Sequence, residues 1–131
     1  MIRAALILLL GAVPVAAQDQ ITAEAFLDRV AGRTATFVMM GTDDLVGVEQ
    51  FLRRDRTVWA RSNGTCAYGT VTVEGPLVCF AYDDEPTGRQ HCWFPLELDG
   101  TLLVLDDEGD EVQEISAITD APVICDPPPI S

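Results

Sequence analysis

The chain is poor in basic residues. It has no lysine, 8 arginines against 21 acidic residues, and a formal net charge of −13. Nucleic acid and anionic lipid surfaces repel such a charge, so neither is an expected partner. A well-solvated monomer, a cationic partner or divalent ions remain compatible with it. If the charge serves more than solubility, the expected partner is a cationic exported protein.

Catalytic side chains are also scarce. His91 is the single histidine, and the serines are Ser62, Ser116 and Ser131. They lie beside a turn, in a late strand and at the end of the chain, so no pattern brings a serine to His91 as a triad would require. We therefore expect a protein that is not an enzyme and has no cofactor.

Long apolar runs are absent after the first residues. Arg3 precedes a run from Ala4 to Val13, and Val15-Ala16-Ala17 has the small residues of a cleavage site. About a dozen apolar residues are too few to span a bilayer, which predicts a secretory signal peptide at residues 1–17. The mature chain would start at Gln18, which is not a cysteine, so no lipid anchor is expected. The predicted location is the periplasm or the medium.

Four cysteines, Cys66, Cys79, Cys92 and Cys125, follow the predicted cleavage site. In an oxidising compartment an even number of cysteines indicates disulfides, here two. The spacings contain no CxxC pair, so a structural metal site is not expected. The mature length of 114 residues suits one domain, placed at residues 18–125 and followed by a proline-rich tail at 126–131.

A single helix is predicted at the start of the mature chain. Thr22 is a favourable N-cap, and Gly32 is placed to end the helix. Between them Phe26, Leu27 and Val30 share one face at helical spacing. This apolar face is expected to cover one end or edge of a sheet.

Eight short strands separated by turn residues follow the helix. Their connections are too short for crossovers, so the strands should form an antiparallel meander. Closure into a barrel would remove the exposed edges. The fold class is mostly β, an eight-stranded antiparallel up-and-down (calycin-like) barrel with one N-terminal helix. The predicted strands are 34–40, 45–52, 56–61, 65–74, 77–82, 89–96, 101–105 and 112–118.

The predicted register pairs the cysteines. If residues 83–88 form a hairpin loop, Cys79 lies opposite Cys92, close enough for a disulfide. Across the Asn63-Gly64 turn, Cys66 faces Arg61 and no cysteine, which leaves Cys66 for Cys125. That second bridge would pin the tail to the barrel. On the chain-entropy view each bridge stabilises the fold by about 3–4 kcal/mol.

The same register sorts the side chains. Val71, Val73, Val78, Phe80, Tyr82, His91 and Trp93 share one face, which is apolar enough to be the interior. Trp59 and Tyr68 pair across their hairpin but fall on the outer face. A bulge at Gly69 would return both to the core. The two arrangements stay open.

Several short motifs resemble one known family. They are Gly32-Arg33-Thr34, Asn63-Gly64-Thr65-Cys66, Cys79-Phe80 and His91-Cys92-Trp93. Over Ile21 to Leu105 the chain is similar to small secreted bacterial proteins of a domain-of-unknown-function family. The resemblance implies a lipocalin-like β-barrel without an established activity. The chain also resembles, more distantly, barrel-type lysozyme inhibitors of the bacterial envelope.

Two functions are compatible with these features. The chain can be an exported binding module that takes a small apolar ligand near His91, Trp93 and Tyr82, or a cationic envelope protein such as a lysozyme. Alternatively it is an accessory envelope protein with a filled barrel. An eight-stranded barrel holds packed side chains or one small ligand, and the aromatic bulk favours the filled barrel. That bulk comes from Phe37, Phe51, Phe80, Tyr82, Trp93 and Phe94.

Carboxylates cluster in three predicted turns. These are Asp43-Asp44, Asp83-Asp84-Glu85 and the run from Asp106 to Glu111. Loop tips commonly carry such residues for solvation. The last run lacks the alternating ligand spacing of an EF-hand, so no metal site is predicted there.

Overall fold

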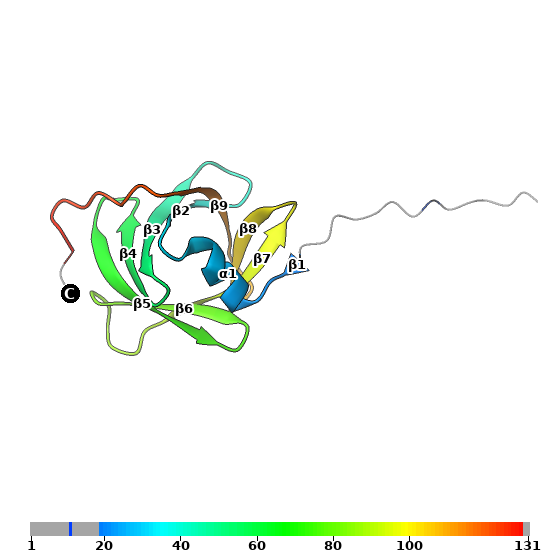
Figure 1. The fold of residues 1–131 in the computed structure, drawn as a ribbon, viewed down its shortest axis with the longest axis horizontal. Helices are drawn as coiled ribbons and strands as arrows, with labels where there is room; N and C mark the ends of the chain where they lie inside the picture. Colours follow the sequence, from blue (N-terminus) through cyan, green and yellow to red (C-terminus); the bar gives the residue numbers. More distant parts are fainter. Residues whose placement is uncertain (1–10, 12–18, 130–131) are drawn as a thin grey trace, which may run out of the picture.

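Eight antiparallel strands close into a barrel in the computed structural model, which describes Gly11 and residues 19–129 (Figure 1). Each barrel strand pairs with the next along the chain, and β2 pairs with β9 to close the circle. The predicted fold class is therefore confirmed. The predicted signal peptide and the predicted start at Gln18 fall outside the described residues, apart from Gly11. The barrel strands are β2 (Thr34–Met39), β3 (Leu45–Arg53), β4 (Arg56–Arg61), β5 (Cys66–Glu74), β6 (Leu77–Tyr82), β7 (His91–Leu98), β8 (Thr101–Asp106) and β9 (Val112–Thr119).

A ninth short strand, β1 (Asp19–Gln20), was not predicted, because two residues carry no periodic pattern. It pairs with Leu96 and Glu97 of β7. The ladder between β6 and β7 spans only residues 91–93 of β7. β1 therefore takes the edge of β7 that β6 leaves free.

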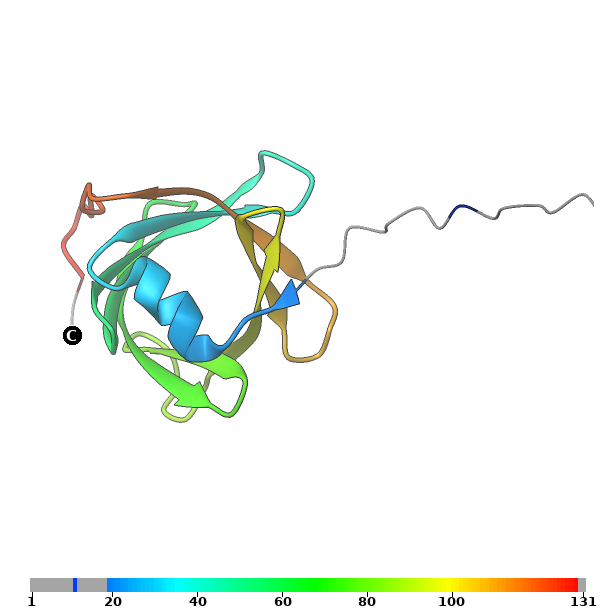
Figure 2. The same cartoon turned by 45° about the vertical axis from the view of Figure 1, so that its right-hand side comes forward.

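The helix α1 (Ala23–Val30) lies across the opening of the barrel (Figure 2). The Thr22 side chain accepts a hydrogen bond from the Ala25 N–H at 3.0 Å, which caps the first turn as predicted. Gly32 follows the helix with a φ of +74°, a conformation that glycine adopts without strain. Its N–H donates to the Phe51 carbonyl and so ties the helix to β3. No helix among the described residues has the length and apolarity needed to cross a membrane.

Both predicted disulfides are present, Cys79–Cys92 and Cys66–Cys125. Cys79 lies directly opposite Cys92, as the predicted register requires. The segment that leads to Cys125 passes along the outside of the barrel near β3 and β4 (Figure 1), where the Val123 N–H donates to the Gln50 side chain.

The register between β4 and β5 corrects two predictions. Cys66 faces Ala60 rather than Arg61, and Trp59 faces Ala67 rather than Tyr68. The hairpin loop has three residues, in which Gly64 alone has a positive φ, instead of a two-residue turn at Asn63-Gly64. One added loop residue shifts the pairing by one and places the two aromatic residues on opposite faces.

No bulge is present at Gly69. The residue pairs in regular register with Thr57 and Tyr82, and its hydrogen takes the place where a Cβ would meet the Tyr82 ring at 2.8 Å. Trp59 lies against the core, whereas Tyr68 faces outward under the Arg56 guanidinium, 5.1 Å from its ring centre. Glycine is needed here for space rather than for a bend.

Candidate functional site

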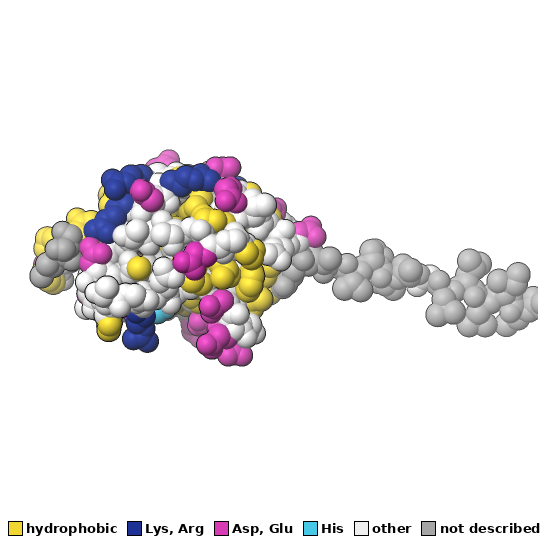
Figure 3. Space-filling model, turned by 90° about the horizontal axis from the view of Figure 1, so that it is seen from below, with side chains coloured by type: hydrophobic (Ala, Val, Ile, Leu, Met, Phe, Trp, Pro, Cys, Tyr) yellow, Lys and Arg dark blue, Asp and Glu magenta, His cyan; other side chains and the backbone are white. Residues whose placement is uncertain are grey.

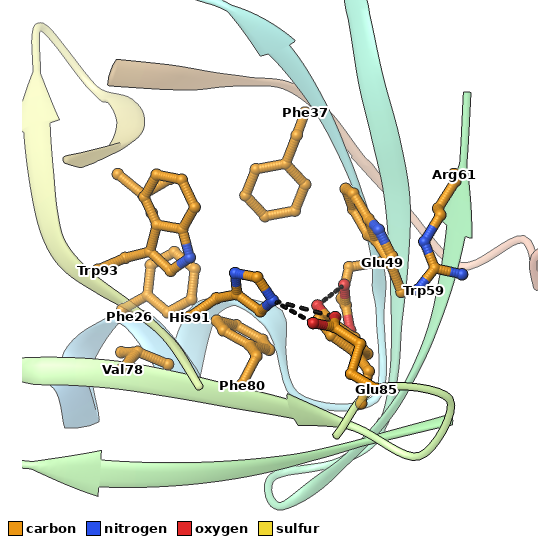
Figure 4. Close-up of a pocket in the computed structure, with 12 residues that line it drawn as sticks. Phe26, Phe37, Glu49, Trp59, Arg61, Val78, Phe80, Glu85, His91 and Trp93 are labelled. Carbon is orange, nitrogen blue, oxygen red and sulfur yellow. Dashed lines mark hydrogen bonds and ion pairs between the residues drawn. The ribbon is translucent and has the colours of Figure 1, made fainter. Parts of the chain in front are cut away.

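A cavity of about 210 Å³ lies inside the barrel. Its wall is mainly aromatic, and Phe26 of α1 contributes to it at the end that the helix covers (Figure 4). The predicted inner face is largely correct, because Val78, Phe80, Tyr82, His91 and Trp93 all reach the cavity and Val71 is buried, whereas Val73, near the end of β5, is 40% exposed. The cavity is lined by Phe26, Phe37, Glu49, Trp59, Arg61, Val78, Phe80, Tyr82, Glu85, His91, Trp93 and Val104.

The aromatic side chains fill the lumen only in part, whereas the sequence favours a filled barrel: Phe26, Phe51 and Phe80 pack together, and a cavity remains beside them. A Cβ built on Gly47 would lie 2.4 Å from the Trp59 ring, so this ring rests directly on the backbone of β3. Gly69 in the same way leaves room for the Tyr82 ring to lie against the backbone of β5. Phe94, counted as core bulk, alternates with the inward-facing Trp93 and belongs to the other face of β7. The rings therefore line the wall and leave part of the lumen open.

Glu49 is the least expected residue of this wall. It follows Gly47 on the inner face of β3 and its exposed fraction is 2%. The Tyr82 hydroxyl donates to Glu49 Oε2 at 3.0 Å, while Glu49 Oε1 is buried without a hydrogen-bond partner. An unpaired carboxylate oxygen in an apolar cavity is costly.

Burial raises the pKa of Glu49 to about 8, against the opposing effects of the nearby Thr57 and Tyr82 hydroxyls and the Arg61 charge. The carboxyl group is therefore mostly protonated at neutral pH. Burial and the Glu49 carboxyl also raise the pKa of Tyr82 well above its ordinary value. The Tyr82 hydroxyl consequently stays a neutral donor.

His91 lies at the mouth of the cavity. Its Nε2 is 3.0 Å from both carboxylate oxygens of Glu85, and the two side chains point toward one another (Figure 4). The His91 ring centre is 5.9 Å from that of Tyr82. His91 is 39% exposed and Glu85 is 20% exposed, so the pair joins the aromatic wall to solvent.

The loop between β6 and β7 is held over the mouth by ion pairs. Asp83 accepts a hydrogen bond from Arg56 at 2.8 Å, and Asp84 accepts two from Arg61 at 2.9 and 3.0 Å. The acidic run predicted as a solvated turn is thus largely paired, because two arginines of β4 face it. Arg61 brings a positive charge to the rim, and Asp84 offsets it.

All three predicted ligand-binding residues, His91, Trp93 and Tyr82, line the same cavity. Sequence reasoning missed Glu49, Arg61 and Glu85. A signal for Glu49 existed, since it alternates with Gly47 and Phe51 on one face of β3. From the sequence alone, Gly47, Glu49 and Phe51 could face either the interior or the solvent. If they face the interior, the carboxylate indicates a functional residue, and the register of β3 decides between the two cases.

Two other groups of described residues bring carboxylates or cysteines to metal-ligand range, but in each group some ligand atoms are already engaged. Asp106, Glu108 and Asp110 bring one oxygen each within 4.8 Å of the others, but Asp106 Oδ1 already accepts two backbone N–H groups. Glu74 lies at similar range from Cys79 and Cys92, whose sulfurs are joined in a disulfide.

The fold and cavity define a small closed antiparallel β-barrel. No protein-family model, no curated protein and no solved structure matches the chain.

Proposed function

We propose that the chain is an exported, non-catalytic binding protein whose barrel takes a small ligand built mainly on one aromatic or aliphatic ring. The observation that carries this proposal is the aromatic-lined cavity of about 210 Å³. An apolar cavity of about 150 Å³ accommodates benzene. The space therefore suits one ring with a short substituent, and it is too small for a lipid.

Other features support the same proposal. Two disulfides suit an oxidising compartment, which agrees with the expected export. An internal cavity is a property that the resemblance to lipocalin-like barrels implies. Among the described residues that line the cavity, none is a serine, threonine or cysteine, so the His91–Glu85 pair has no adjacent nucleophile to activate.

Occupation of the cavity can be tested with 4-fluorotoluene, followed by fluorine NMR on the purified protein. We expect saturable broadening of the probe signal by the wild type. Val104→Phe adds a ring to the cavity wall and should abolish it. Leu52→Phe also introduces a ring, at a leucine that is 45% exposed and alternates with the inward-facing Phe51, and should retain it. Equal signals from all three proteins, or no binding by the wild type, would favour an accessory protein without a ligand.

A second candidate function, binding of a cationic protein, rests on the surface charge. Each of the seven arginines in the described part of the chain forms an ion pair with a carboxylate. The remaining acidic side chains are left without a basic neighbour of this kind, and some lie exposed on the face shown in Figure 3. Titration with lysozyme at low and high salt tests this function, because a charge-driven complex weakens in salt. No binding at low salt would exclude lysozyme.

A further inference from the structure

Among the residues that line the cavity, one side-chain oxygen is buried without a hydrogen-bond partner, and the nearby Thr57 hydroxyl, which is also buried and unpartnered, is not part of the lining. Glu49 Oε1 is buried, and its side chain belongs to the cavity wall (Figure 4). The second oxygen, Oε2, already accepts from Tyr82. Once the carboxyl group has lost its proton, Oε1 is an acceptor for any bound group that carries hydrogen-bond donors.

The surroundings of Glu49 favour a positively charged donor. Trp59 and Tyr82 lie with ring centres 6.4 Å apart, and Phe37 lies 5.9 Å from Trp59. The faces of such rings attract cations. Tyr82 also donates to the Glu49 carboxyl group, but only at Oε2, so Oε1 stays open to a cation.

The charged groups at the mouth offset one another. Arg61 is paired with Asp84, and Glu85 is paired with Arg89 at 3.4 Å, so neither lining charge opposes a cation on its own. The net charge of −13 adds a long-range attraction for cations. The same net charge repels an anionic ligand.

We infer that the ligand carries a protonated amine, which donates to Glu49 Oε1 while its ring packs against the aromatic wall. This inference rests on the proposed function and specifies its ligand as a compact ring with a short aminoalkyl group. The ammonium would ionise Glu49 and release its proton to solvent, so the bound pair consists of an ammonium and a carboxylate. The amine gains two interactions, a charge-assisted hydrogen bond and contact with ring faces.

The test compares three probes that share one ring: 4-fluorobenzylamine, 4-fluorotoluene and 4-fluoroacetophenone. We expect the wild type to bind the amine about tenfold more tightly than the neutral toluene. Glu49→Gln keeps the shape of the side chain and should bring the ratio of the two affinities, amine over toluene, down to about one. Glu108→Gln, in the exposed β8–β9 loop, is the matched control and should behave as the wild type does.

The pH dependence of the wild type gives an independent readout if Glu49→Gln does not fold. The titratable or charged groups that share the cavity with Glu49 are Tyr82 of β6, Arg61 of β4, Glu85 of the β6–β7 loop and His91 of β7. Affinity for the amine should rise roughly tenfold between about pH 6.5 and 8.5, as Glu49 loses its proton. A rise centred near the ordinary histidine value, about 6.5, would assign it to His91 instead and overturn the inference.

The outcomes separate the inference from the proposed function. Two results would contradict the inference of an amine ligand while leaving the proposed binding function intact. In one, 4-fluorotoluene binds as tightly as the amine; in the other, 4-fluoroacetophenone binds more tightly than both. The second result would mean that a protonated Glu49 donates to a carbonyl oxygen. If the wild type binds none of the three probes, the proposed function itself fails.

Discussion

The two ends of the barrel are closed in different ways. At one end α1 inserts an apolar face, in which Phe26 and Val30 are fully buried and Phe26 meets Phe51 edge to face. At the mouth, charged side chains of the β6–β7 loop pair with arginines of β4, and most of these groups remain partly exposed. The first closure excludes water, whereas the second keeps a polar rim around the cavity.

The two ends are expected to contribute differently to the free energy of folding. Burial of large apolar side chains is the main source of folding free energy, while exposed ion pairs contribute little. The helix end should therefore carry the stability of the barrel, and the mouth can vary at small energetic cost. Glu49 lies in the apolar interior and on the wall of the cavity.

The largest expected effect is at the helix end. Phe26→Ala should lower the free energy of unfolding by about 3–5 kcal/mol, because it removes a buried ring and leaves a void. Urea denaturation measures the change. Leu52→Ala, at a leucine that is 45% exposed, is the control and should cost far less. A loss below about 1 kcal/mol for Phe26→Ala would mean that α1 does not seal the barrel.

Glu49 should make stability fall as pH rises. Its pKa increases from 4.5, the value for an exposed chain, to about 8 in the folded protein. Between these values the folded state binds more protons than the unfolded state, so the stabilising effect is complete below about pH 4.5 and disappears by about pH 8. The difference between wild type and Glu49→Gln should change by about 3 kcal/mol from pH 5 to 8. A constant difference across this range would show that Glu49 titrates normally.

Substitutions at the mouth of the cavity should change the free energy of unfolding less. Arg61 and Asp84 are 27% and 44% exposed, so their coupling should be about 0.5–1 kcal/mol and should weaken in salt. A double-mutant cycle with Arg61→Gln and Asp84→Asn measures it. Coupling above about 2 kcal/mol that persists in salt would place this pair with the buried interior instead.

The smallest effect is expected at His91. Its side chain is 39% exposed, so His91→Gln should change the free energy of unfolding by about 0.5 kcal/mol or less. Thermal melts of both proteins provide the comparison. A loss of about 1–3 kcal/mol would indicate instead that His91 is a buried group left without its partner.

Two hairpins show how far the fold follows from sequence. Asp99-Gly100 turns between β7 and β8 with positive φ at both residues, the two-residue turn that such a pair favours. Asn63-Gly64 carries an equally strong signal, yet Ser62 joins its loop and only Gly64 has a positive φ. Strand positions follow from local patterns, but a register depends on the exact loop length, which residue preferences alone do not determine.

The residues of the candidate site also differ in whether their register could be predicted from the sequence. Tyr82, His91 and Trp93 could be placed on one face because the Cys79–Cys92 pairing anchors their register. Glu49 could not, since β3 has no such anchor and a glutamate is ordinarily an outward residue. Its burial depends on the closure of β2 against β9, a contact between the two ends of the barrel sequence.

The central claim is that the cavity holds a neutral carboxyl group poised for an amine, and a carbon-13 NMR titration of the glutamate carboxyl groups tests it most directly. The Glu49 signal is assigned by its loss in Glu49→Gln. The signal should titrate near pH 8 in the free protein and at lower pH when 4-fluorobenzylamine saturates the cavity. A Glu49 signal that titrates near 4.5, with or without the amine, would contradict the account.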